Sequence, residues 1–437
     1  MNIVIMVAQL ILGLSILVLL HEFGHYITAR AFGIKVEKFY LFFDAWGFKL
    51  FKYTYKGTEY GIGWLPLGGY VKIAGMIDES MDKEQLSQPM QPWEFRSKPA
   101  WQRLIVMIGG VTVNLILGVV LFTMVIMVFE KEYVPISAID KGIYAYEMGR
   151  KVGFQTGDKI VAVGGKKIER FKDASPMMLV MGESFQVERN GQLKTITVND
   201  AFYAEFKESK SKRIFEAYSN DCSIDSIIAM RPAVKSGFKI GDNPTAINDS
   251  IIIDSWGTFE ENIIKFANKS IKITVLRNAE KIDLTITPDT AGIGVAHKLP
   301  IFPKTAYTFS QAIKYGWKDA MDMLSLNIKG MGKIFKGEEK ATESLSGPIG
   351  IAQIYGGVWD WHKFWYITGL LSLILAFMNI LPIPALDGGH VIFLIIEAIT
   401  GKTFSDKFME RVQMVGMVLI MGLMIFAFGV DIFKLFR

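Results

Sequence analysis

The sequence predicts an α-helical membrane protein with about four transmembrane helices, a membrane re-entrant β-element, and an α+β insert of two similar domains. Composition is the first indication: 51% of residues are apolar and mean hydropathy is +0.29, too apolar for an ordinary soluble protein, yet 21% are charged. The second is a set of four long apolar runs, and the third is a repeated motif between the second and third runs. A membrane module with a sizeable aqueous insert accounts for all three.

The apolar runs locate the membrane helices. A helix that crosses the hydrocarbon core needs roughly 20 apolar residues. Met1 to Leu20 contains no charged residue, and we expect the first helix over residues 3–31. The other predicted spans are residues 104–129, 364–381 and 412–430. The start of the chain lacks a basic region and a small-residue cleavage site, so we do not expect a cleavable signal.

Basic residues predict the orientation of these helices. Arg30, Lys35 and Lys38 follow the first span, and further basic residues precede the second and fourth spans. Because short cytoplasmic loops are enriched in Lys and Arg, we expect the N-terminus and segment 130–363 on the outer side.

The net charge of +5 comes without a basic tract, which argues against a nucleic-acid partner. A single cysteine, Cys222, excludes an intrachain disulfide.

Three ionisable residues lie at the end of the first predicted helix: His21, Glu22 and His25. Such groups are costly inside a membrane and usually functional. His21 and His25 are four residues apart, so both project from one helix face and can bind one metal ion. Glu22 is close enough to reach a water on that metal without being a ligand. Zinc suits two imidazoles, a third ligand and an open position; a chance motif would leave three buried ionisable groups unexplained.

The loop at residues 36–76 is predicted to form β-structure. Residues 51–60 alternate and turn at Gly57, which is typical of a β-hairpin. Residues 61–71 are apolar and rich in glycine, which would be unusual on a cytoplasmic surface. A β-segment that re-enters the membrane against the helices explains this composition, because non-helical backbone is tolerated there when it lines protein or a cavity. A small cytoplasmic sheet is the alternative.

The second predicted span carries Gly110, Asn114 and Gly118 at four-residue intervals on one face. Small residues at this spacing allow two helices to approach closely. Asn114 is the one strongly polar side chain in the middle of the span. It either contacts the metal site or bonds a neighbouring helix, and the spacing does not decide between these.

The segment outside the membrane contains an internal repeat. Residues 153–158 read Gly-Phe-Gln-Thr-Gly-Asp, and residues 237–242 read Gly-Phe-Lys-Ile-Gly-Asp. Short β-type runs follow each copy, which predicts two similar domains.

Phe309 to Phe335 has a helical pattern with its large apolar side chains along one side, which favours packing on the membrane or on the domains; an ordinary core-facing helix is the alternative. The predicted division is a membrane part over residues 1–130, domains over 131–205 and 210–290, an amphipathic helical linker over 291–363, and the last two membrane helices over 364–437.

A third metal ligand is expected where the third span ends. Residues 379–390 contain two prolines that break the helix and two glycines that permit tight turns beside Asp387. A carboxylate at membrane depth needs a partner, and a metal held by His21 and His25 would be one. His390, Glu397 and Asp44 compete with Asp387 for this role.

These motifs, taken together and in order, resemble the site-2 protease family of intramembrane zinc metalloproteases, in particular the bacterial regulator-of-sigma-E type. The resemblance covers nearly the whole chain. It is carried by His-Glu-Phe-Gly-His at 21–25, Gly-Trp-Leu-Pro-Leu-Gly-Gly-Tyr-Val at 63–71, Gly110 with Asn114, Gly-Pro-Ile-Gly at 347–350, and Asn-x-x-Pro-x-Pro-x-Leu-Asp-Gly-Gly-His at 379–390.

The resemblance implies roles for individual residues. His21, His25 and Asp387 would bind Zn²⁺, and Glu22 would be the catalytic base that activates water. The expected substrate-binding residues are Asn379, Gly61, Gly63, Tyr70 and Asn114. An extended substrate would add as a strand to the edge of the 61–70 region.

The resemblance also implies a biological setting: a multi-pass protein of the bacterial inner membrane with its active site towards the cytoplasm. The two repeats would be tandem periplasmic PDZ domains. The substrates would be single-span membrane proteins such as anti-sigma factors, or remnant signal peptides, cut during an envelope stress response, with a site-1 protease acting upstream. The repeats depart from the usual PDZ pattern at Gly164-Gly165 and at Pro244, and neither shows a clear carboxylate-binding loop, which favours a steric filter.

Two other classes of function compete with the protease. A non-catalytic membrane PDZ scaffold would not need Glu22, which is present together with all three candidate ligands. A metal transporter would need further ionisable pairs along the spans, and the sequence offers none. We therefore expect a zinc-dependent intramembrane endopeptidase.

Overall fold

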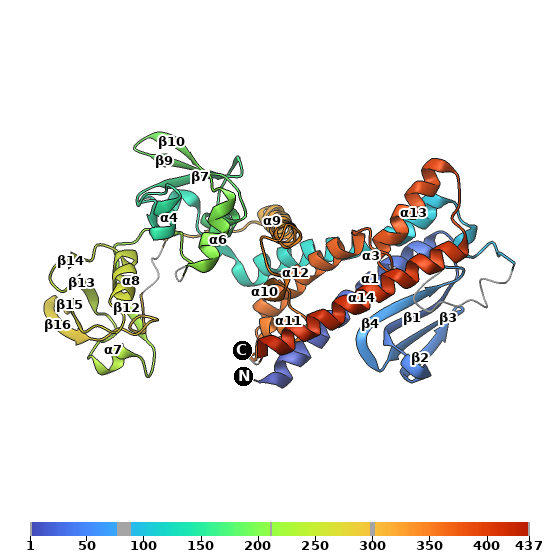
Figure 1. Ribbon diagram of the computed structural model, residues 1–437, viewed down its shortest axis with the longest axis horizontal. Coiled ribbons are helices and arrows are strands. Elements are labelled where there is room, and N and C mark those ends of the chain that lie inside the picture. The colour runs from blue at the N-terminus through green and yellow to red at the C-terminus, as the bar shows by residue number, and fades with distance from the viewer. Residues whose placement is uncertain (1, 77–88, 210–211, 298–301, 436–437) are drawn as a thin grey trace. The chain divides into compact units, whose positions relative to one another are not determined.

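The computed structural model describes residues 2–76, 89–209, 212–297 and 302–435 of the chain (Figure 1). The chain forms two compact units. One combines Met1–Lys131 with Tyr307–Arg437, and the other is Glu132–Ala306. The first holds all the predicted membrane spans and the second holds both repeats.

Among the described residues, four helices are long and apolar enough to cross a membrane, which agrees with the predicted number. They are α1 (Ile3–Ala31), α3 (Ala100–Val125), α12 (Trp361–Ile380) and α14 (Asp406–Leu435). A π-helical turn extends α3 to Glu130. A fifth apolar helix, α13 (Asp387–Thr400), follows α12 after a short turn.

Small residues let these helices approach closely, as the sequence predicts. A side chain on Gly24 of α1 would overlap the backbone of Gly109 in α3, so the two backbones are in contact there. Gly118 makes room for Leu373 of α12. The glycine-rich face of α3 therefore packs against two helices. The first half of α3 packs on α1, and the second half packs on α12.

A four-stranded sheet lies beside α1 (Figure 1). Its strands are β1 (Val36–Phe43), β2 (Lys49–Tyr55), β3 (Thr58–Gly63) and β4 (Leu65–Ile73), in the order β2-β3-β1-β4. The predicted hairpin is confirmed: β2 and β3 are joined at Lys56 and Gly57, whose φ values of 46° and 79° suit a tight two-residue turn. At the other edge, β4 packs on α1, where Gly69 abuts Val18.

Helix α9 (Phe309–Phe335) has the predicted bounds and packs on α3 and α12. Its buried residues are Ala312, Tyr315, Gly316 and Ala320. Gly316 sits so close to Thr123 of α3 that a methyl group there would overlap it. Trp317, one of the large apolar side chains of the predicted stripe, is 55% exposed. Met321 and Leu324 of the same stripe pack against the cluster that contains Phe122 and Leu373. Helix–helix contact selects the small side chains here, and part of the larger apolar stripe faces outward.

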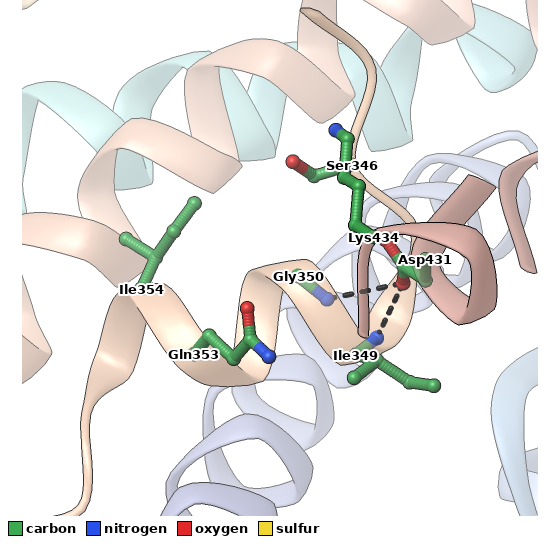
Figure 2. A pocket seen from close by; sticks show the side chains of 7 residues that line it. All are labelled: Ser346, Ile349, Gly350, Gln353, Ile354, Asp431 and Lys434. Atoms are coloured by element: carbon green, nitrogen blue, oxygen red, sulfur yellow. Dashed lines mark hydrogen bonds between the residues drawn. The ribbon is translucent and has the colours of Figure 1, made fainter. Parts of the chain in front are cut away.

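The short helices α10 (Ala341–Ser344) and α11 (Pro348–Tyr355) precede α12. The N-terminus of α11 is held by Asp431 of α14, whose carboxylate accepts hydrogen bonds from the backbone N–H groups of Gly347, Ile349 and Gly350 at 2.8–3.0 Å. Figure 2 shows the bonds from Ile349 and Gly350 to Asp431, beside a pocket of about 270 Å³. The Gly-Pro-Ile-Gly motif thus forms a helix N-terminus whose backbone N–H groups bind a buried carboxylate from the last helix.

In the second unit, two repeats have the same order of elements except for α6, which has no counterpart in the second repeat. The first comprises β6 (Ile143–Ala145), α4 (Glu147–Lys151), β7 (Lys159–Val163), β8 (Lys166–Lys167), α5 (Pro176–Val180), β9 (Phe185–Arg189), β10 (Gln192–Ile196), α6 (Asp200–Glu208) and β11 (Phe215–Ala217). The second comprises β12 (Ile224–Ile227), α7 (Pro232–Lys235), β13 (Asn243–Ile247), β14 (Ile251–Ile252), α8 (Trp256–Lys265), β15 (Ile271–Arg277), β16 (Glu280–Ile286) and β17 (Val295–His297). The short strands β5 (Glu132–Tyr133) and β18 (Thr305–Ala306) pair at the ends of the unit.

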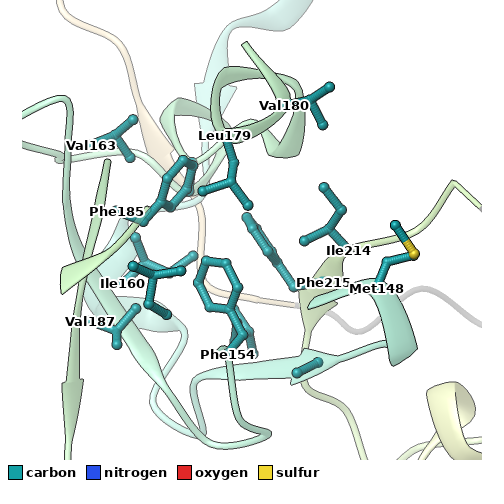
Figure 3. Close-up of a cluster of buried hydrophobic side chains, with 14 of the residues drawn as sticks. Met148, Phe154, Ile160, Val163, Leu179, Val180, Phe185, Val187, Ile214 and Phe215 are labelled. Carbon is teal, nitrogen blue, oxygen red and sulfur yellow. The ribbon is translucent and has the colours of Figure 1, made fainter. Parts of the chain in front are cut away.

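The sheets of the two repeats correspond strand by strand. The order β10-β9-β7-β8 in the first matches β16-β15-β13-β14 in the second, and the pair β6–β11 matches β12–β17. Each repeat has its own apolar core. Figure 3 shows the first, in which Phe154, Phe185 and Phe215 contact one another. Gly164 and Gly165, one of the noted departures, form the β7–β8 turn with φ values of 57° and 74°.

The repeated Gly-Asp motif has the same structural role in both repeats. Asp158 accepts two hydrogen bonds from the guanidinium of Arg189, at 2.6 and 2.7 Å, and the same guanidinium donates to the Gly153 carbonyl. Asp242 is bound in the same way by Arg277, which also donates to the Gly237 carbonyl. Both aspartates are fully or almost fully buried, so the motif stabilises the fold of each repeat.

The predicted domain boundaries are too short at their C-terminal ends. Strand β11, at residues 215–217, pairs with β6 and so lies past the expected end at residue 205. Strand β17, at residues 295–297, pairs with β12 and lies past residue 290, inside the expected linker. Three-residue strands carry no periodicity in the sequence, and tertiary pairing alone defines them.

Candidate metal centre

The first two candidate ligands come from one face of α1. His21 and His25 are 8% and 6% exposed, and their Nε2 atoms lie 3.3 Å apart. The rings meet edge to face with a centroid separation of 4.9 Å. One helical turn separates them, as their spacing predicts, and both Nε2 atoms point to the same place.

The third candidate ligand comes from the turn between α12 and α13. Asp387 is the first residue of α13, and its Oδ2 lies 3.3 Å from His21 Nε2 and 3.4 Å from His25 Nε2. Gly388 packs against the Ile380 and Leu381 carbonyls at the end of α12. Gly389 packs against the Ile383 carbonyl in the turn, and a side chain on either glycine would overlap backbone. The two glycines thus allow the chain to fold back tightly enough to present this carboxylate.

The residues that competed with Asp387 lie elsewhere. Glu397 forms an ion pair with Arg103, and Asp44 accepts a hydrogen bond from the Tyr70 hydroxyl at 2.8 Å. His390 bonds Gln413 of α14. His21, His25 and Asp387 form the cluster of potential metal ligands found among the described residues.

The geometry of this cluster fits a tetrahedral metal ion. Ligand atoms that lie 2.0–2.1 Å from a tetrahedral zinc are separated from one another by about 3.3–3.4 Å. The three separations between His21 Nε2, His25 Nε2 and Asp387 Oδ2 are 3.3, 3.3 and 3.4 Å. Two imidazoles and one carboxylate are also the donor set of a catalytic site that keeps a fourth position for water or substrate.

Helix α3 supports the imidazoles from behind. His25 Nδ1 lies 2.8 Å from the Val106 carbonyl, which can only accept, so Nδ1 carries the proton and Nε2 presents its lone pair to the cluster. His21 Nδ1 lies 3.0 Å from the side-chain amide of Asn114, which is fully buried. Gly110 lies between them, and a side chain there would overlap His25 Nε2 and come within 2.7 Å of His21 Cε1.

Two further residues adjoin the cluster. Glu22 follows His21 on α1 and interacts with the backbone N–H of Val71 in β4. Its Cγ lies 3.7 Å from where a Cβ on Gly69 would stand, so the glutamate sits against the edge of the sheet. Asn379, near the end of α12, places its amide 3.3 Å from His21 Nε2.

The remaining expected substrate residues lie in the sheet. Gly61 packs under the ring of Tyr40, and Gly63 packs against the Phe43 backbone, so each has a steric reason to lack a side chain. Tyr70 stacks on Tyr40 and Phe43 and donates its hydroxyl proton to Asp44. The lining residues of the pocket in Figure 2 include none of the candidate site residues.

Sequence analysis missed the Val106 carbonyl and the steric role of Gly110. A backbone acceptor leaves no trace in the residue type, so no signal could have identified Val106. Gly110 stands four residues before Asn114, the same interval that separates His21 from His25. Because the intervals match, Gly110 and Asn114 could have been predicted to face His21 and His25 if the two helices pack together.

Comparison with known proteins gives a family match over most of the chain. The model of peptidase family M50 matches residues 9–423. A Vibrio cholerae protein whose name describes it as a zinc metalloprotease is 28% identical over 97% of this chain and 98% of its own length. The regulator of sigma E protease of Haemophilus influenzae is 27% identical, again over 97% and 98%. Protease RseP of Yersinia pestis is 28% identical over 98% of both chains.

The family match spans the candidate ligands of α1 and the Asp387 turn as well as most of α14. With the apolar helices and the clustered imidazoles and carboxylate already described, it confirms the expected kind of enzyme. The chain belongs to peptidase family M50, the site-2 protease family, and is a membrane metalloendopeptidase.

Proposed function

We propose that this protein is a zinc-dependent endopeptidase that cuts single-span membrane proteins within the membrane. The observation that carries the proposal is the convergence of His21, His25 and Asp387 at tetrahedral spacing, beside Glu22. His21, His25 and Asp387 would hold the ion. When bound, zinc would supply a Lewis acid that polarises the scissile carbonyl and lowers the pKa of a water towards about 7.

Glu22 is the general acid and base. It lies next to His21 on the same helix and against the β4 edge, where an attacking water and a peptide would meet. A carboxylate in this place accepts the proton of the water as it attacks and returns it to the leaving amine. Asn379 is placed to donate its amide N–H to the substrate backbone, since that amide lies 3.3 Å from His21 Nε2.

Strand β4 holds the substrate in an extended form. A peptide in a membrane helix has its carbonyl groups hydrogen-bonded and shielded, so it must unwind before water can attack it. Strand β4 is an edge strand of the β2-β3-β1-β4 sheet and runs past Glu22 at Gly69. A substrate strand added to this edge would have its backbone bonds satisfied and its carbonyl next to the catalytic base. Gly61, Gly63 and Tyr70 shape the sheet that presents this edge, which we take to re-enter the membrane.

The cellular setting follows from the relatives and the basic residues. The chain is a multi-pass protein of the bacterial inner membrane, with the metal site towards the cytoplasm and the repeats in the periplasm. The repeats act as PDZ-like domains that admit substrates already shortened by a site-1 protease. Substrates of the anti-sigma-factor type, or remnant signal peptides, would place the reaction in an envelope stress response.

Cleavage of a defined reporter tests the proposal. The wild-type protein and its Glu22→Gln form are purified and incubated with a single-span reporter peptide in detergent or vesicles. We expect cleavage by the wild type and a loss of about 100- to 10,000-fold in the variant, because the general base is removed. Equal behaviour of the two would support a non-catalytic scaffold. Metal flux in vesicles that does not depend on Glu22 would instead support a transporter.

A further inference from the structure

The inference concerns Asn114, the polar residue in the middle of α3. Its side chain has no exposed surface, and its amide contacts His21 Nδ1 at 3.0 Å. Its Oδ1 atom is buried and has no hydrogen-bond partner among the described residues. A buried amide oxygen without a partner in an apolar bundle is costly, which indicates that this amide has a further interaction to make.

The expected binding of zinc by His21 indicates which interaction the Asn114 oxygen makes. A histidine that binds metal through Nε2 must carry its proton on Nδ1. For His25 the Val106 carbonyl already imposes this form, since a carbonyl can only accept. For His21, the contact at Nδ1 found in the described part of the chain is with the amide of Asn114. Its nitrogen lies nearest to Nδ1, and two donors cannot bond to each other.

Rotation of the Asn114 amide by 180° removes the clash between two hydrogen-bond donors at His21 Nδ1. The nitrogen and oxygen of an asparagine occupy equivalent positions about the terminal bond, so the rotation places Oδ1 at the position that now faces Nδ1. The unpartnered oxygen would then accept the Nδ1–H of His21. Ser372 of α12 donates to the backbone carbonyl of Asn114 at 2.7 Å, so this hydrogen bond does not involve the side-chain amide.

We propose that Asn114 is a positioning residue that accepts the Nδ1–H of His21 through Oδ1 and so fixes the tautomer in which His21 binds zinc. The inference rests on the proposed function, because it concerns the same metal site. It assigns to α3 the task of orienting both imidazoles: Val106 orients His25 by a backbone carbonyl, and Asn114 orients His21 by a side chain that can be changed.

Zinc affinity of the purified full-length protein tests this, with Asn114→Leu and Asn114→Asp as the two variants. Zinc dissociation constants are measured by competition with a chromophoric chelator. Leu fills a similar volume and cannot accept, so binding should weaken by about 10–100-fold, as losses of such supporting partners do. Asp can only accept, so Asn114→Asp should bind zinc within about threefold of the wild type. Ser372→Ala, which removes a buried hydroxyl that contacts α3 but neither imidazole, is the matched control and should leave affinity unchanged.

The Asp variant decides the direction of the hydrogen bond. If Asn114 donated to His21, a carboxylate would fail in its place, and a loss of tenfold or more in Asn114→Asp would overturn the proposal. Unchanged affinity in Asn114→Leu would overturn it as well. The absorption spectrum of the cobalt-substituted protein gives a second measurement: we expect the wild-type spectrum in Asn114→Asp and an altered one in Asn114→Leu.

The outcomes also separate this inference from the proposed function. If the wild type binds zinc and cleaves the reporter while Asn114→Leu binds zinc equally well, only the role of Asn114 fails. If Glu22→Gln cleaves as the wild type does, the proposed function fails although the positioning role can still hold. If the wild type binds no zinc, both are overturned.

Discussion

At the scale of single residues, the candidate site depends on an absent side chain as much as on the candidate metal ligands. Gly110 stands where α3 faces the two imidazoles, and any Cβ there would occupy the space of His25 Nε2. Backbone atoms of α3 and α1 are in contact at Gly109 and Gly24, so this packing leaves no space for a side chain at the neighbouring Gly110. The position of the rings is therefore set by how closely the two helices pack.

Gly110→Ala should prevent metal binding while the protein remains folded. The added methyl group pushes the imidazoles apart, so we expect zinc affinity to fall by about 100-fold or more, by analogy with the loss of a supporting partner. Zinc content after dialysis measures this. Gly422→Ala in α14 is the matched control, because a Cβ there meets no atom within 4 Å. Equal zinc content in the two variants would contradict the steric role of Gly110.

The residues of the site differ in how far the sequence could predict them. His21, Glu22 and His25 follow from local spacing on one helix, which the chain fixes by itself. For the third metal ligand, the sequence left a few candidates, among them Asp387. The prolines and glycines around Asp387 indicate a turn but do not indicate which residues the turn faces. The partner of Asn114 could not be predicted, since two apolar helices can pack in several registers, and only tertiary contact selects one.

At the scale of elements, the last helix is tied to the rest of its unit at a few points. Asp431 is 3% exposed and accepts the three N–H groups of α11 described above. Lys434, one turn later, donates to the Glu343 and Leu345 carbonyls. Along much of its length α14 exposes apolar residues, which suits a helix that faces lipid. The carboxylate of Asp431 is thus the main polar contact that anchors the C-terminal end of α14.

Asp431→Ala should loosen this end of α14. Removing the carboxylate leaves backbone N–H groups of α11 without acceptors, which should lower the free energy of unfolding by about 2 kcal/mol. The apparent melting temperature in detergent measures the effect. Lys434→Ala, which removes an exposed lysine at the same site, should change the melting temperature much less. A melting temperature of Asp431→Ala equal to the wild type would show that α14 is held by other contacts.

The elements were predicted unevenly, for physical reasons. Long apolar helices, the β2–β3 hairpin and α9 carry strong periodic or turn signals, and the structure confirms them. Strands β11 and β17 were missed because three residues give no pattern, and they exist only by pairing with β6 and β12. The predicted packing side of α9 is only partly right. Met321 and Leu324 of the apolar stripe pack against the cluster that contains Phe122 and Leu373. Close contact with Thr123 of α3 selects Gly316, and Trp317 is left exposed.

At the scale of the whole molecule, the candidate metal site belongs to one unit alone. Its ligands and supporting residues come from α1, α3, α12 and α13, all in the first unit, and the repeats of the second unit have separate apolar cores. The single cysteine, Cys222, is buried in the core of the second repeat. It therefore reports on the folding of that repeat.

Asp242→Ala should destabilise the second repeat and leave the metal site intact. Burial raises the pKa of the Cys222 thiol to about 12, so at pH 8 only about one molecule in ten thousand is a thiolate and labelling requires opening of the repeat. Loss of the carboxylate bound by Arg277 should speed labelling by about tenfold or more, while zinc content stays unchanged. Asp158→Ala, the equivalent change in the first repeat, should have little effect on Cys222. Equal acceleration by both variants would mean that the repeats unfold together.

The central claim is that His21, His25 and Asp387 bind one zinc ion between them, and metal analysis of the purified protein tests it most directly. We expect one equivalent of zinc in the wild type, one in Glu22→Gln, and less than about a tenth of an equivalent in His21→Ala and in Asp387→Ala, because two remaining ligands hold zinc weakly. A full equivalent of zinc in Asp387→Ala, or none in the wild type, would contradict the account.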